Sequence, residues 1–123
     1  MNTVGCVDLP TVEECRGAAT VIEDDCLREC VMAQCAGAKV NCGEDVSQRC
    51  RAKSQQRSKA VGGFVVMGEQ TCRLPRNEIN WCQRPMPRPC RAKAMAHELA
   101  HSCGWMHGDG MNVPADTGTL KCD

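Results

Sequence analysis

Cysteine is the feature that most limits how this chain can fold. Twelve of its 123 residues are cysteine, a density typical of small exported domains held together by disulfides. The aromatic residues that usually fill a core are scarce, with one Phe, two Trp and no Tyr. Covalent cross-links can offset such a shortage. We therefore expect paired cysteines and a secreted protein, located in an oxidising extracellular or periplasmic compartment.

The spacing of the cysteines favours disulfides over metal or redox chemistry. The chain contains no C-x-x-C pair, which argues against structural zinc, iron–sulfur and thioredoxin-like sites. Cys26 and Cys30 are four residues apart in a helix-forming stretch, so both should link one helical face to other elements. The spacing does not determine the pairing. The cysteines occupy positions 6, 15, 26, 30, 35, 42, 50, 72, 82, 90, 103 and 122.

The charge balance and hydropathy exclude two classes of partner. Fifteen basic residues face fifteen acidic ones, whereas nucleic-acid binding depends on a net basic surface. No apolar run approaches the roughly 20 residues of a membrane span. The first residues lack the basic and apolar segments of a signal peptide. We expect a mature form, or a domain of a longer exported protein.

The pattern of local signals predicts one α+β domain over residues 1–123. It is small, disulfide-rich and mainly helical, with a short β-sheet and an active-site helix near the C-terminus. Thr11 and Glu14 have the spacing of a capping box that opens a helix. The expected parts are an irregular lead-in over 1–10, a helical part over 11–60, a strand region over 61–82 and a zinc-site helix and turn over 90–111.

Within these parts, glycines, prolines and residue propensities mark the elements. Gly104 is expected to end the last helix, since glycine tolerates the positive φ of a sharp turn. The predicted helices cover 12–36, 41–56 and 90–103; the predicted strands cover 62–68 and, more weakly, 71–74 and 79–82; residues 105–123 are expected to be coil.

All three histidines lie within eleven residues, in the sequence HELAHSCGWMH that begins at His97. On a helix, His97 and His101 project from one face, one turn apart, so both imidazoles can bind one metal ion. The turn at Gly104 can return His107 to the same ion. Three imidazoles with one open position are the ligand set of a catalytic Zn²⁺.

Glu98 lies beside His97 and is expected to be the general base. Zinc lowers the pKa of a bound water toward about 7, and Glu98 can take its proton as the water attacks a peptide carbonyl. The same carboxylate can then deliver the proton to the leaving amine. The sequence thus predicts a zinc-dependent endopeptidase acting on peptide or protein substrates.

The spacing His97-Glu98-x-x-His101-x-x-Gly104-x-x-His107 resembles the zinc-binding consensus of the metzincin metallopeptidases. The resemblance covers residues 90–111 and implies three zinc ligands, a general base and a turn at these positions. It also implies a methionine turn beneath the metal, for which Met111 is the candidate, and an edge strand that binds the substrate, best matched by residues 64–67. Met111 follows His107 by only four residues.

Several neighbouring residues admit other roles. An aspartate-liganded zinc would need Asp109, Asp116 or Asp123, of which Asp109 is the best candidate. His107 has the metzincin spacing and takes precedence, so Asp109 is expected to be a loop or supporting residue. Cys103 is expected in a disulfide, and Cys90 and Cys103 would then fix both ends of the active-site helix. Trp105 and Met106 either line the substrate pocket or pack in the core.

Two other functions remain open from the sequence. The same zinc chemistry could hydrolyse cell-wall peptides, or the chain could be a non-catalytic, disulfide-stapled interaction scaffold. The scaffold hypothesis leaves the histidine motif unexplained. A small peptidase without a visible propeptide would endanger its own cell, so the chain is further expected to be the toxin or effector domain of a larger secreted protein, restrained by an inhibitor or immunity protein.

Overall fold

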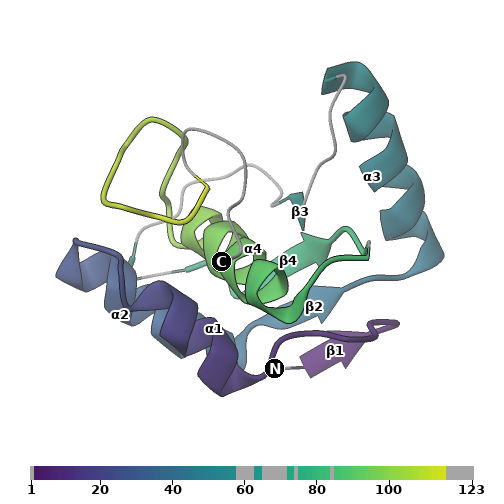
Figure 1. Cartoon of the computed structure of the whole chain (residues 1–123). Coiled ribbons are helices and arrows are strands. Elements are labelled where there is room, and N and C mark those ends of the chain that lie inside the picture. Colours follow the sequence, from purple (N-terminus) through teal and green to yellow (C-terminus); the bar gives the residue numbers. More distant parts are fainter. Residues whose placement is uncertain (1, 58–62, 65–71, 74, 84, 116–123) are drawn as a thin grey trace.

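A computed structural model describes residues 2–57, 63–64, 72–73, 75–83 and 85–115. These residues form a disulfide-rich α+β fold that is mostly helical, as predicted. Figure 1 shows helix α4 between the helix pair α1–α2 and a short sheet. The helices are α1 (Val12–Ala19), α2 (Asp25–Gly37), α3 (Glu44–Arg57) and α4 (Arg88–Ser102).

The sheet is mixed, with the strand order β1-β2-β4-β3. Strands β1 (Asn2–Val4), β2 (Lys39–Asn41) and β4 (Glu78–Trp81) run parallel, and β3 (Gly63–Phe64) pairs antiparallel with β4. Val40 lies opposite Ile79 in the register, and both side chains are fully buried. Strand β3 is therefore at the edge of the sheet formed by the described residues.

The single helix predicted over 12–36 is wrong, because the chain forms two helices there. The capping box of Thr11 and Glu14 is present and begins α1. The chain then leaves the helix after Ala19, and Asp24 begins α2 by accepting a hydrogen bond from the Leu27 amide. This break lets α1 and α2 pack against each other, which a continuous helix could not do.

The two strands nearest the N-terminus were not predicted. Residues 2–4 belong to the expected lead-in, and residues 39–41 lie at the predicted boundary between helices. The second predicted helix therefore begins later, at Glu44 rather than residue 41. Strands of three residues carry almost no periodicity, and here they form because distant segments pair with them.

The remaining sequence predictions concern strands and coil, and some of them lie outside the residues that the structure describes. The strand predicted over 79–82 is confirmed as β4 for residues 79–81, while Cys82 follows the strand. The coil over 105–115 is confirmed. The strand predicted over 71–74 is wrong for Cys72 and Arg73, which lie in a turn. Of the strand predicted over 62–68, Gly63 and Phe64 are confirmed, while 62 and 65–68 lie outside the described residues, as do 58–61 and 116–123.

Disulfides join α1, α2 and α3 to other parts of the described fold, and a further bridge holds α4 at Cys103, the residue that follows it. Cys26 and Cys30 of α2 bond to different elements, as their spacing predicted, and no described cysteine is free. Cys90 is also disulfide-bonded. The five bridges within the described residues are Cys6–Cys42, Cys15–Cys35, Cys26–Cys72, Cys30–Cys103 and Cys50–Cys82. They fit an oxidising, extracellular compartment.

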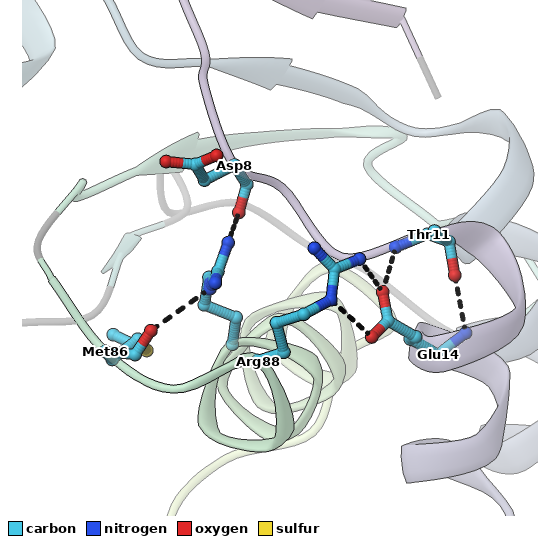
Figure 2. A network of polar contacts seen from close by, with 6 residues as sticks. Asp8, Thr11, Glu14, Met86 and Arg88 are labelled. Carbon is cyan, nitrogen blue, oxygen red and sulfur yellow. Dashed lines mark hydrogen bonds and ion pairs between the residues drawn. The ribbon is translucent and has the colours of Figure 1, made fainter.

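The first turn of α4 is fastened to the N-terminal part of the chain. Figure 2 shows the Arg88 guanidinium donating to both carboxylate oxygens of Glu14, at 2.7 and 3.1 Å. Arg91 donates to the carbonyl oxygens of Asp8 and Met86. Pro89 is compatible with this helix because it lies in the first turn, where its missing N–H leaves no hydrogen bond unmade.

Candidate metal centre

Helix α4 supplies two of the three histidines, and both face the imidazole of the third. The Nε2 atoms of His97 and His101 are 3.3 Å apart. The Nε2 atom of His107 lies 3.0 Å from that of His97 and 3.2 Å from that of His101. Among the described residues these three form the group able to hold a metal ion. The structure thus brings together the three ligands that the sequence predicted.

The spacing of the three nitrogens fits a small tetrahedral metal ion. With metal–nitrogen bonds of about 2.0–2.1 Å, tetrahedral ligands lie roughly 3.3–3.4 Å from one another. The observed separations of 3.0–3.3 Å approach that value. Three nitrogen lone pairs at this distance repel one another unless a proton or a cation lies between them. The donor set therefore suits a borderline-soft divalent cation such as Zn²⁺.

Backbone carbonyls determine the tautomer of two of the imidazoles. The Nδ1 atom of His97 lies 2.7 Å from the Pro114 carbonyl oxygen, and that of His101 lies 2.9 Å from the Trp105 carbonyl oxygen. A carbonyl oxygen can only accept, so Nδ1 must carry the proton in both rings. In each neutral ring Nε2 then presents its lone pair to the cluster. This arrangement is the usual support for a metal-binding histidine.

The turn after α4 brings His107 back to the helix. Gly104 has a φ of 96°, as the sequence predicted, and its amide donates to the His101 carbonyl at 3.0 Å. The Trp105 amide donates to the Ala100 carbonyl, also at 3.0 Å. These two bonds are those of a Schellman motif, which ends a helix and reverses the chain. A glycine is required because other residues strain at this φ.

Trp105 packs as a core residue rather than on an open surface. Its side chain is 3% exposed, and its ring centroid lies 4.9–5.5 Å from those of all three imidazoles. Its indole N–H donates to the Gly110 carbonyl at 3.2 Å. The sequence left this role open, because a tryptophan beside a turn fits both packing and a substrate pocket. The next residue, Met106, is 60% exposed.

Glu98 is a buried carboxylate next to the imidazole cluster. Its residue is 6% exposed, and its Oε1 atom lies 4.0 Å from His97 Nε2. Burying a carboxylate costs free energy unless polar partners compensate. Its position, close to His97 Nε2 but outside the group of three imidazoles, is compatible with proton transfer to or from a molecule bound beside that group.

Two further sequence predictions concern the ends of α4 and the loop that follows the helix. Cys103 follows the helix directly and bonds to Cys30 of α2, while Cys90 in the first turn is also disulfide-bonded. Both ends of the helix are therefore cross-linked, as expected. Asp109 is a loop residue, again as expected: its Oδ2 atom accepts a hydrogen bond from the Met106 amide at 3.0 Å.

Met111 does not have the surroundings expected of a methionine beneath the metal. It lies in a turn with a φ of 62°, and it is 39% exposed. Its carbonyl oxygen accepts a hydrogen bond from the Glu23 amide at 2.8 Å. The backbone of this turn therefore fastens the His107 segment to the α1–α2 junction, while the Met111 side chain is partly exposed to solvent.

Comparisons with known proteins do not identify a family. No family model, no curated protein and no solved structure matches this chain. No helix among the described residues is long and apolar enough to cross a membrane. The function must therefore be inferred from the geometry of the site itself.

Proposed function

We propose that this protein is a zinc-dependent endopeptidase whose centre resembles that of the metzincins. The observation that carries the proposal is the triangle of Nε2 atoms of His97, His101 and His107, with sides of 3.0–3.3 Å. Glu98, buried 4.0 Å from one of these atoms, supports a hydrolytic role over a structural one, because a structural site has no use for a buried base and normally has four protein ligands.

The three histidines would hold the ion, and Glu98 would move the proton. A zinc ion held there would supply a Lewis acid, which would acidify water and stabilise negative charge on a carbonyl oxygen. Glu98 accepts the proton of the attacking water and then delivers it to the departing amine. The amide C–N bond breaks as the new C–O bond is completed, so the products are a carboxylate and an amine.

Strand β3 is the part of the fold best suited to align an extended substrate. It lies at the edge of the described sheet, and an edge strand can pair with a further strand through its backbone. Gly63 of this strand is adjacent to the Glu98 side chain. A peptide paired with β3 would therefore run past the catalytic carboxylate.

Secretion and a toxin or effector role, restrained by an inhibitor or immunity protein, complete the proposal. The five disulfides support an oxidising destination. A peptidase of this kind needs restraint until it reaches that destination. Reading the parent open reading frame tests this part: a chain that begins at Met1, with no partner gene nearby, would count against it.

The test of the activity combines metal analysis with proteolysis. Wild-type protein and the Glu98→Gln variant are each analysed for zinc and incubated with an unbiased peptide library. We expect one zinc in both proteins and cleavage by the wild type alone, with the variant slower by a factor of about 10²–10⁴. Glu13→Gln, which changes an exposed glutamate of α1, is the matched control and should cleave normally.

The outcomes separate the alternatives left by the sequence. Cleavage of cell-wall peptides only would keep the chemistry and change the substrate class. Absence of stoichiometric zinc would contradict the proposal and favour the interaction scaffold. Cleavage by Glu98→Gln at the wild-type rate would show that another group is the base.

A further inference from the structure

Gly63 of β3 lies directly against the Glu98 side chain. A β-carbon built on Gly63 would lie 3.0 Å from Cγ and 3.1 Å from Cδ of Glu98. It would also lie 2.9 Å from the carbonyl oxygen of Asn80 in β4. Side-chain carbons do not normally pack this closely, so every residue other than glycine would have to displace one of these neighbours.

Steric space, not backbone freedom, explains the glycine. The φ of Gly63 is outside the left-handed region that favours glycine. Gly63 also lies opposite Trp81 in the regular pairing of β3 with β4. Glycine usually weakens a strand, and in a strand interior it often marks a close approach of other groups. Here two groups approach, the Asn80 carbonyl of the neighbouring strand and the Glu98 side chain, which comes from α4.

We infer that Gly63 is a positioning residue for Glu98, an inference that rests on the proposed function. The Glu98 side chain fills the space beside the Gly63 backbone, and its Oε1 atom lies 4.0 Å from His97 Nε2. The bare backbone at Gly63 forms one wall of this space. A methyl group there would push the carboxylate away from its place beside β3, while the three histidines, which lie on α4 and the following turn, would keep their positions.

The contact is tested first without metal or activity, by a double-mutant cycle in thermal unfolding. The four proteins are the wild type, Gly63→Ala, Glu98→Ala and the double variant, all metal-free with disulfides intact. Glu98→Ala removes the Cγ and Cδ atoms, while the Asn80 oxygen is present in all four and cancels. We expect Gly63→Ala to lower Tm by at least about 3 °C more in the presence of Glu98 than in its absence.

The functional role is tested by separating kcat, KM and zinc affinity. We expect Gly63→Ala to bind zinc within about threefold of the wild type, with KM changed by less than about twofold and kcat lowered at least tenfold, because small misplacements of catalytic groups are costly. Gly17→Ala is the matched control: apart from its chain neighbours and the backbone of its own helix, nothing lies within 4 Å of its added methyl, so all three constants should stay unchanged.

Four results would overturn the inference. Equal Tm losses in both backgrounds, or a kcat at the wild-type level, would show that Gly63 does not position Glu98. If Gly63→Ala fails to fold and Glu98→Ala does not rescue it, the Asn80 carbonyl is the reason for the glycine. If the wild type itself binds zinc but cleaves nothing, the proposed function fails and this role fails with it, even where the unfolding cycle shows coupling.

Discussion

The tautomer of two imidazoles depends on backbone carbonyl oxygens that no sequence motif encodes. His97 and His101 keep Nε2 free for a metal because Pro114 and Trp105 accept from Nδ1. The spacing of the histidines, Glu98 and Gly104 was sufficient to predict that the three imidazoles gather beside this glutamate and that the chain turns at Gly104. It could not reveal the Pro114 contact, since a backbone acceptor can be provided by any residue type.

Trp105 offers a test of how packing supports the metal centre. Trp105→Ala removes the ring that touches all three imidazoles. We expect a zinc affinity lower by about 10–100-fold, as for other residues that hold ligands in place, and a loss of about 3–5 kcal/mol in the free energy of unfolding. Zinc titration and denaturant unfolding measure the two effects.

Met106→Ala is the control for this prediction, because the side chain follows Trp105 directly but is 60% exposed. Its unfolding free energy should change by less than about 0.5 kcal/mol. If Trp105→Ala binds zinc as tightly as the wild type, the ring packs against the ligands without supporting them.

At the scale of elements, α4 is held at both ends, by an ion pair at its start and a disulfide at its end. Its first turn is bound to α1 through Arg88 and Glu14, and its last is joined to α2 through Cys103 and Cys30. The helix and its apolar face were predictable from residue propensities and periodicity. The α1–α2 break and the strands β1 and β2 were not, because contacts between distant residues, rather than local preferences, decide them.

The Glu14–Arg88 pair should make stability depend on pH in the acid range. Hydrogen bonds from the Arg88 guanidinium, and then from the Thr11 amide, lower the pKa of Glu14 from 4.5 to about 2. Because the folded pKa is the lower one, the contribution of the pair is complete above pH 4.5 and is lost as the pH falls toward 2. The pair is solvent-exposed, so its effect is modest.

Thermal unfolding of the wild type, Glu14→Gln, Arg88→Gln and the double variant between pH 2 and 7 tests this prediction. The Tm difference between the wild type and Glu14→Gln should be constant above about pH 5 and should shrink between pH 4.5 and 2. The two substitutions should be less than additive at neutral pH. A difference that does not vary with pH would show that the contact is electrostatically unimportant.

Cys30–Cys103 should matter for metal binding, unlike the bridge Cys15–Cys35. The first bridge ends one residue before the Gly104 turn, whereas the second joins α1 to α2. Replacing either pair with alanines should lower the free energy of unfolding by about 2–5 kcal/mol. Zinc titration of both folded variants should show weaker binding only without Cys30–Cys103, and equal affinities would contradict this assignment.

At the scale of the whole molecule, the twelve cysteines and the three histidines serve separate purposes. The cysteines join the helices, strands and turns of a fold that has few aromatic residues, and the three histidines gather at one site. The abundance of cysteine predicted the class of fold, but not the pairing, because many connectivities share one sequence. The resemblance implied an edge strand over 64–67, and Phe64 lies in β3 at the edge of the described sheet, but the order of the strands came only from the structure.

The most direct test of the metal centre is X-ray absorption at the zinc edge of protein loaded with one equivalent of zinc. Coordination by His97, His101 and His107 predicts three imidazole nitrogens and one further oxygen at about 2.0–2.1 Å, with no sulfur. Sulfur scatterers at about 2.3 Å, or fewer than three imidazoles, would contradict the proposed centre.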